Sequence, residues 1–165
     1  MKTGPYNEEL LEVLDTCKGT LLHICMMYTD CRKEHVTELY HEMVYQLVKG
    51  YPRFRGESGV TTWAYRTALN TARRYRRWHR RQPATEPLDE RLCELVAEEG
   101  CDPLVERMRE LTDRLRDDER QLVVLYLDGF PLHEIADILS LPEATVRQRL
   151  HRTTIKLKKI YEKEN

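Results

Sequence analysis

Hydrophobic residues recur at helical spacing through most of the first eighty positions. An apolar side chain falls every three or four residues over positions 10–28, and a second series covers positions 36–48. This spacing collects the apolar side chains on one face, so we expect two amphipathic helices. After a turn-rich stretch, a third helix is expected from about residue 61 to residue 81. Small residues, Ala64 and Ala68 among them, lie on its packed face.

A second helical region starts near Leu104 and leads to two short helices joined by a turn, over residues 132–152. Pro142 suits the first turn of the second of these helices, because proline lacks the N–H that would have no partner there. The side chains expected to face inward from this helix are Val146, Leu150, Thr154 and Leu157. Its arginines point elsewhere. The pattern is a helix-turn-helix with a basic second helix, which fits the major groove of DNA.

Between the two helical regions, Pro83 and Pro87 end the third helix, and an acidic stretch follows that is poor in large apolar residues. We interpret it as a linker with at most one short helix around residues 88–97. Strand alternation is absent at any convincing length. The sequence therefore predicts an all-α fold of two small domains, residues 1–81 and 104–165, joined by an acidic linker at 82–103, with the helix-turn-helix in the C-terminal domain.

The net charge of −1 conceals a strong segregation of charge. Residues 51–81 hold nine arginines and one carboxylate, whereas residues 82–119 hold five arginines and thirteen carboxylates. The basic block could face phosphates, and the acidic block would be repelled by them. No apolar run has membrane-spanning length, and no signal-peptide core is evident. The five cysteines have no framework spacing, so a reducing cytoplasmic location is the expectation.

Arginines and aromatic residues alternate near the end of the third helix, in RRYRRWHRR at residues 73–81. A solvated helix face would mix the signs of charge, but no carboxylate stands at i,i+4 spacing here. Contact with nucleic acid is therefore favoured. Phe54, Trp63, Tyr65 and Trp78 lie near these arginines; at least one is expected in the core, while aromatics beside arginine also stack on unpaired bases.

Other site chemistry is poorly supported. His23, Cys25, Cys31 and His35 have unsuitable spacing for zinc, and no nucleophile motif or glycine-rich phosphate loop is present. We therefore expect no catalytic residue, no metal and no cofactor. A polar stripe on the second helix, formed by Glu38, His41, Glu42 and Gln46, is either ordinary solvated surface or an acidic docking surface.

Three segments in this order resemble the extracytoplasmic-function (ECF) sigma factors of the sigma-70 family. TELYHEMVYQL (37–47) is similar to the family's polymerase-binding helix. FRGESGVTTWAYRTALNTARRYRR (54–77) is similar to its promoter-melting segment, and residues 118–152 are similar to its promoter-reading domain.

The resemblance implies a role for each group of residues. The residues implied to contact the β′ clamp helices of RNA polymerase are Glu38, Leu39, His41, Glu42 and Gln46. The loop 54–59, with Phe54 and Arg55, is implied to capture the −10 element. The residues implied to hold the separated strands are Trp63, Tyr65, Asn70, Arg73, Arg74 and Arg77. Reading of the −35 element falls to Thr145, Arg147, Gln148, Arg149 and Arg152.

The implied partners are core RNA polymerase, through its β′ clamp helices and β flap, promoter DNA, and an anti-sigma factor. No small-molecule substrate and no membrane insertion are implied. The alternative that stays open is a dimeric helix-turn-helix regulator that acts without polymerase.

Overall fold

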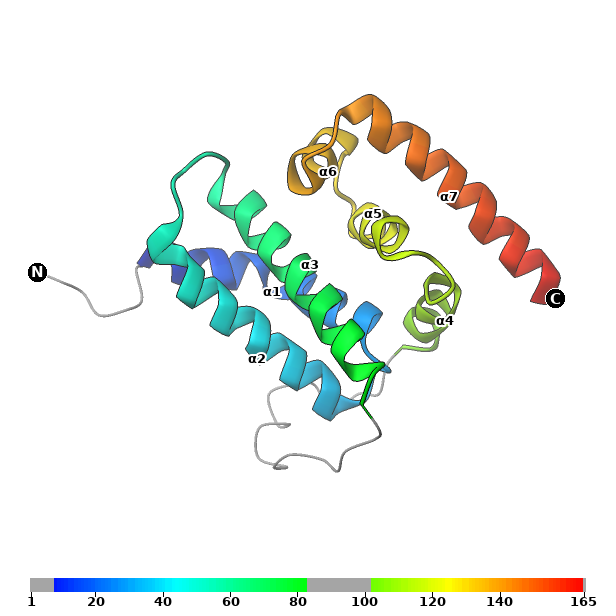
Figure 1. The fold of residues 1–165 in the computed structure, drawn as a ribbon, viewed down its shortest axis with the longest axis horizontal. Helices are drawn as coiled ribbons and strands as arrows, with labels where there is room; N and C mark the ends of the chain where they lie inside the picture. Colours follow the sequence, from blue (N-terminus) through cyan, green and yellow to red (C-terminus); the bar gives the residue numbers. More distant parts are fainter. Residues whose placement is uncertain (1–7, 83–101, 165) are drawn as a thin grey trace, which may run out of the picture. The chain divides into compact units, whose positions relative to one another are not determined.

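The structure, a computed structural model, describes residues 8–82 and 102–164, and every regular element in these two ranges is a helix (Figure 1). The chain divides into two compact units, residues 1–101 and 102–165. The prediction of an all-α fold with two helical domains is confirmed. The exact boundaries at residues 81 and 104 stay predictions, and the short helix expected near residues 88–97 lies outside the described residues. Within the described ranges, no helix combines the length and apolarity needed to cross a membrane.

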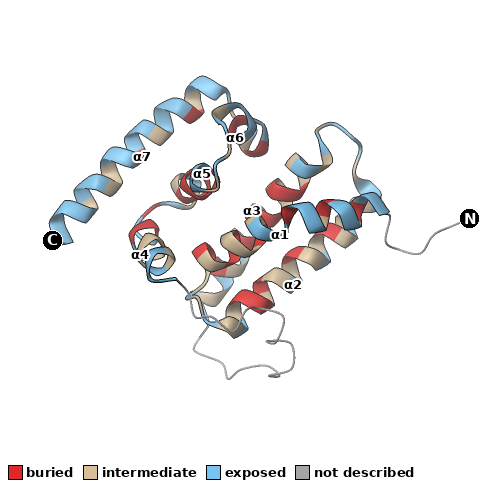
Figure 2. Cartoon of the chain, turned by 180° about the vertical axis from the view of Figure 1, so that it is seen from behind, coloured by how far each residue is buried: buried red, intermediate tan, exposed pale blue. Residues whose placement is uncertain are grey.

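The N-terminal unit is a bundle of three helices: α1 (Glu8–Tyr28), α2 (Lys33–Gly50) and α3 (Val60–His79), with a short 3₁₀ turn, η1 (Tyr51–Arg53), after α2. Each of the three long helices packs against the other two. Their buried faces meet in one core (Figure 2). The largest side chains in this core are Leu10, Leu21, Ile24, Met27, Leu39, Met43, Leu47 and Leu69. Ala64, Ala68 and Ala72 line the buried side of α3, and their small size lets the other two backbones approach.

The C-terminal unit contains α4 (Pro103–Thr112), α5 (Asp117–Leu127), α6 (Leu132–Leu139) and α7 (Glu143–Glu164). The start of α4 is capped by the Asp102 carboxylate, which accepts the N–H of Leu104 at 2.8 Å. A break at residues 113–116 separates α4 from α5. Arg120 spans this break: its guanidinium donates to the Thr112 carbonyl at 2.6 Å and to Asp113 Oδ1 at 2.9 Å. Its side chain is fully buried, so the interhelical turn is fixed from within.

The helix-turn-helix follows the sequence pattern in outline, with two differences in detail. Pro142 stands directly before α7 rather than in its first turn, and its carbonyl accepts the N–H of Val146 at 3.1 Å. Thr154 is exposed, and Thr153 takes the inward position instead. Val146 and Thr153 are seven residues apart, which keeps the buried stripe of α7 on one side over two full turns.

The helices α5 and α6 end in the same backbone motif. The N–H of Phe130 reaches the Leu125 carbonyl after α5, and the N–H of Leu141 reaches the Ala136 carbonyl after α6. Each motif needs a left-handed residue just past the helix. After α5 this residue is Gly129 (φ 84°), but after α6 it is Ser140 (φ 55°). The turn of the helix-turn-helix therefore carries backbone strain that the preceding turn avoids.

Replacing Ser140 with glycine should stabilise the C-terminal unit by about 1 kcal/mol, since glycine adopts a positive φ without the Cβ clash. Urea unfolding of the full chain, followed by far-UV circular dichroism, measures this gain. The matched variant Gly129→Ser should lose a similar amount, because space around Gly129 is open and only the backbone conformation is at stake. Equal stability of Ser140→Gly and the parent chain would refute the strain.

Candidate nucleic-acid interface and partner-binding groove

The outer face of α7 presents the side chains predicted to read DNA. Arg147, Gln148, Arg149 and Arg152 are exposed, and Thr145 is half-buried. Glu143, one turn earlier, holds the Arg147 guanidinium at 2.8 Å. Arginine at a helix surface can donate two hydrogen bonds to the major-groove edge of guanine. The exposed face of α7 thus has the chemistry of a base-reading helix.

The position of α7 depends on an ion pair with α5. Glu119 accepts a hydrogen bond from Lys156 Nζ at 2.7 Å and another from the backbone N–H of Arg116 at 2.9 Å. Burial raises the pKa of Glu119, but the hydrogen bonds from Lys156 and the Arg116 amide lower it by more, so the pKa lies below its usual value of 4.5. The ionised carboxylate therefore links the start of α5 to the middle of α7.

Acid should weaken this connection. Because the pKa of Glu119 is lower in the folded chain than in the unfolded chain, its carboxylate stabilises the fold at neutral pH. That stability is lost as the pH falls below about 4.5 and through the lower folded pKa. Urea unfolding of Glu119→Gln should show a deficit at pH 7 that shrinks toward pH 3.5. The exposed control Glu162→Gln should show no comparable deficit at pH 7; a Glu119→Gln deficit that is independent of pH would contradict the assignment.

Three aromatic rings gather where α2 passes into α3. The Phe54 and Trp63 ring centroids lie 5.3 Å apart, and Tyr51 lies 6.1 Å from Trp63. The Trp63 ring also rests against Gly50: a Cβ at that position would come within 3.1 Å of the indole. Arg55 is exposed in the adjoining loop. The result is an aromatic cluster (Tyr51, Phe54 and Trp63) with a cation, Arg55, nearby. The rings are suited to stacking on bases, and the cation is suited to binding a phosphate.

Some of the predicted strand-binding residues lie on the exposed side of α3, and others do not. Asn70, Arg74 and Arg77 are exposed, and Arg73 is half-buried. Tyr65 is only 6% exposed and belongs to the core of the bundle, so we remove it from the strand-binding set. The arginine run is also divided, because Arg76, at 7% exposure, turns to the packed side. Position 76 is four residues after buried Ala72 and eight after buried Ala68, which puts it on the packed side of α3.

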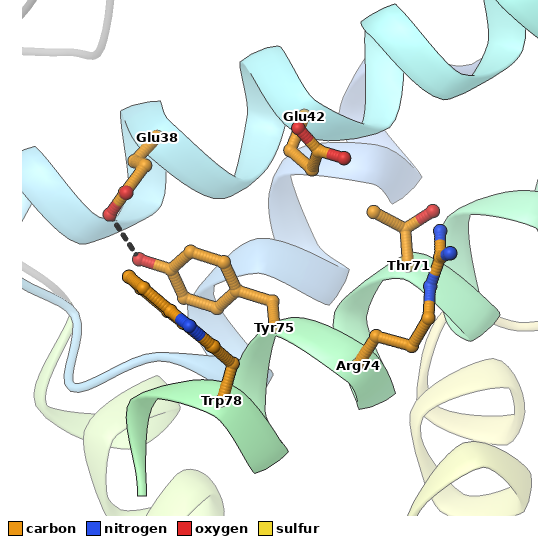
Figure 3. Close-up of a pocket in the computed structure, with 6 residues that line it drawn as sticks. All are labelled: Glu38, Glu42, Thr71, Arg74, Tyr75 and Trp78. Carbon is orange, nitrogen blue, oxygen red and sulfur yellow. Dashed lines mark hydrogen bonds between the residues drawn. The ribbon is translucent and has the colours of Figure 1, made fainter. Parts of the chain in front are cut away.

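A groove of about 380 Å³ lies between α2 and α3, with Glu38 and Glu42 on the α2 side. Figure 3 shows the side chains that α3 contributes, which are Thr71, Arg74, Tyr75 and Trp78. The Tyr75 hydroxyl donates to Glu38 Oε2 at 2.6 Å, and His79 Nε2 lies 3.4 Å from the same oxygen. Burial and this hydrogen bond raise the pKa of Tyr75, so the phenol remains a donor.

The polar stripe predicted on α2 is only partly at this groove. Glu42 lines it and accepts a hydrogen bond from Gln46 at 2.8 Å, whereas His41 is exposed elsewhere on the helix. Leu39 has no exposed surface and packs in the core of the bundle, so its burial does not support the predicted polymerase contact. Tyr75 and Trp78 both belong to the arginine and aromatic run at residues 73–81. Their spacing from Thr71, at i+4 and i+7, is the signal that places all three on one face.

The histidines and cysteines considered for zinc do not converge. Cys25 is buried, with its Sγ 3.7 Å from Met43 Sδ, and His35 Nδ1 lies 2.7 Å from Asp30 Oδ1. Burial raises the pKa of the Cys25 thiol. In the part of the chain that the structure describes, no three His, Cys, Asp or Glu side chains come close enough to hold a metal ion.

Comparison with known sequences links both units to one family. Residues 14–82 match the model of sigma-70 region 2, and residues 106–157 match the model of sigma-70 region 4. The chain is 32% identical over 131 residues to the ECF RNA polymerase sigma-E factor of Escherichia coli (strain K12), which covers 71% of this chain and 69% of that protein. It is 27% identical over 137 residues to the sigma-E factor of Haemophilus influenzae, covering 73% and 71%.

Solved structures share the fold. CnrH, in its complex with the cytosolic domain of CnrY, has a TM-score of 0.70 at 16% identity, covering 96% of this chain and 92% of that one. The sigma factor RpoE from Bartonella quintana, in its complex with the anti-sigma factor NepR, has a TM-score of 0.58 at 18% identity, covering 94% and 95%. At these identities the likeness is one of fold.

Proposed function

Because this chain belongs to the sigma-70 family, in its ECF group, we propose that it binds core RNA polymerase, directs the enzyme to promoters and helps to open the DNA. The observation that carries this function is the presence of both regions in order, with region 2 in the arginine-rich unit and region 4 in the helix-turn-helix unit. A dimeric regulator that acts without polymerase is not favoured, because such a protein has no use for region 2.

The two units divide the promoter between them. Arg147, Arg149 and Arg152 on α7 read the −35 element in the major groove, supported by Thr145 and Gln148. In the other unit, the aromatic cluster and the loop with Arg55 capture an unpaired base of the −10 element. Asn70, Arg73, Arg74 and Arg77 then hold the separated strands. Exposure of most of these side chains supports this division.

Protein partners follow from the same assignment. Glu38, Glu42 and Gln46 on α2, with exposed His41, are placed against the β′ clamp helices, and the C-terminal unit is placed against the β flap. Bartonella quintana RpoE was solved with an anti-sigma factor, and we propose that this chain has such a partner too. The protein catalyses no reaction itself, and it works in the cytoplasm, where the polymerase and the chromosome are.

Reconstituted transcription tests this function. The purified full chain is added to core RNA polymerase with a library of promoter fragments from the bacterium that encodes it, and transcripts are sequenced from their 5′ ends. We expect start sites that appear only when the chain is present and that share two upstream elements. Failure to form a stable complex with core polymerase would overturn the proposal.

Substituting the −35 reading arginines should separate DNA recognition from polymerase binding. Arg147→Ala and Arg149→Ala should each weaken binding of the holoenzyme to the upstream element by about 1–3 kcal/mol, or roughly fivefold to 150-fold. Affinity for core polymerase should be unchanged, because both side chains lie on the exposed face of α7. Filter binding with intact and scrambled −35 elements measures affinity for the upstream element, and competition between variants measures affinity for core polymerase. Loss of polymerase binding in both variants would show that the roles are assigned wrongly.

A further inference from the structure

A carboxylate stands at the end of α7 that is expected to enter the major groove. The helix begins at Glu143, just after the turn that follows α6 (Figure 1). In a helix-turn-helix, the N-terminal residues of the second helix contact base edges. The Glu143 side chain is 46% exposed. A negative charge so close to DNA opposes binding, because the phosphates repel it. A base that donates a hydrogen bond to the carboxylate would offset this repulsion.

The carboxylate is held beside an arginine that is assigned to the −35 element. Glu143 Oε1 accepts a hydrogen bond from the Arg147 guanidinium at 2.8 Å, and the Arg147 side chain is 69% exposed. A carboxylate can accept several hydrogen bonds, so Glu143 can contact a base while it stays bound to Arg147. Because the two side chains touch, a base that meets Glu143 belongs to the base pair that Arg147 reads or to an adjoining one.

The same helix carries a similar ion pair at its other end. Lys158 Nζ lies 3.9 Å from Glu162 Oε1, and these residues are also four positions apart. Glu162 is roughly 28 Å further along the helix axis than Glu143. The major groove is only about 12 Å wide, so Glu162 lies outside it when the start of α7 lies within it. Position along the helix, and not the ion pair itself, therefore distinguishes Glu143.

Cytosine is the base whose major-groove edge suits a carboxylate. Guanine presents the acceptors N7 and O6, adenine presents the acceptor N7 beside its amino group, and thymine presents the acceptor O4. Cytosine presents only its N4 amino group, which is a donor. A carboxylate is thus attracted to cytosine and meets a lone pair on each of the other three bases. Arginine has the opposite preference, because guanine offers it two acceptors.

We propose that Glu143 is a specificity-determining residue of the −35 contact: its carboxylate accepts a hydrogen bond from cytosine N4, in the base pair that Arg147 reads or in an adjoining pair. This inference rests on the proposed function, which assigns Arg147 to the −35 element and gives Glu143 no part in reading it. Glu143 selects by repulsion as well as by attraction, since it disfavours the bases that present an acceptor.

Selection from a pool of promoters with a randomised upstream element tests the site. Core polymerase loaded with the full chain should select a cytosine in the same base pair as the guanine read by Arg147, or in an adjoining one. Exchange of that cytosine for thymine should weaken binding about fivefold or more. Glu143→Ala should reduce this preference to about twofold or less. Glu143→Gln should shift it toward adenine, because an amide pairs with adenine N6 and N7.

Two further variants serve as controls. Arg147→Ala should lose the preference for guanine and keep the preference for cytosine. Glu162→Gln, which alters the similar ion pair at the far end of α7, should select the same element as the parent chain. Circular dichroism shows whether each variant is folded.

The outcomes separate a base-reading role from a structural one. A parent element without the cytosine, or an unchanged cytosine preference in Glu143→Ala, would overturn the inference. Equal weakening on every upstream element would show that Glu143 only stabilises the start of α7, and loss of the guanine preference alone would show that it only orients Arg147; each would also overturn it. A parent holoenzyme that selects no upstream element would instead overturn the proposed function.

Discussion

Arg120→Ala should unfold much of the C-terminal unit at ambient temperature. The Arg120 side chain has no exposed surface, and it bonds to the Thr112 carbonyl and to Asp113 across the break between α4 and α5. Truncation removes these hydrogen bonds and leaves a cavity, at a cost of about 3–5 kcal/mol. A domain of this size holds only a few kcal/mol in total. Urea unfolding of the full chain, with hydrogen exchange of the α5 amides, should show the C-terminal unit open first.

A second substitution at the same position separates packing from charge. Arg120→Met fills much of the volume with an apolar chain, and such replacements of buried ion pairs cost less than truncation does. We therefore expect Arg120→Met to be more stable than Arg120→Ala. Arg116→Ala, at an exposed position, should be nearly neutral. If Arg120→Ala unfolded at the same urea concentration as Arg116→Ala, the buried guanidinium would have no structural importance.

Trp63→Ala should remove most of the protein's capacity to hold melted promoter DNA. The Trp63 ring organises the aromatic cluster through its contacts with Phe54 and Tyr51, and it is seated on Gly50. Stacking on an aromatic ring contributes about 1–3 kcal/mol per base. Loss of this ring also frees Phe54, so we expect affinity for single-stranded −10 DNA to fall by roughly a hundredfold.

Holoenzyme binding to a fluorescent single-stranded −10 oligonucleotide measures this loss, and permanganate reactivity of promoter thymines reports opening. Binding to a duplex with only the −35 element should be unaffected. Trp63→Phe should restore part of the affinity, because it keeps an aromatic face. Normal opening by Trp63→Ala would exclude the aromatic cluster from base capture.

The sequence alone was enough to predict the helices and the family. Apolar spacing located the bundle and the helix-turn-helix, and the resemblance to ECF sigma factors is confirmed by matches to regions 2 and 4. Periodicity is informative because each amphipathic face must be buried somewhere. It also placed Leu39 on the apolar face of α2. The family motif assigned that leucine to a partner, whereas in the structure it is buried in the core, as the periodicity predicts.

Features that depend on two helices at once could not be predicted in this way. The α2–α3 groove is lined by residues of two helices, and no pattern within one helix shows which residues of the other come to face it. Thr153 and Thr154 are one helical step of 100° apart. A small error in extending the inward-facing stripe of α7 from Val146 was therefore enough to select Thr154 in place of Thr153. Ser140 gave no signal of a left-handed turn, because glycine is the residue that normally marks one.

The two faces of α3 have a thermodynamic consequence. Arg77 and Trp78 are adjacent in its last turns, so the groove and the strand-binding face share the same few peptide units. If core polymerase lies against the α2–α3 groove while promoter DNA is held by Arg77, as the proposed function has it, both partners restrict the same last turns of α3. Such a linkage is reciprocal: melted DNA must tighten the grip on polymerase by the same factor by which polymerase tightens the grip on DNA. Release of the promoter strands after initiation would then loosen the hold of polymerase on this protein.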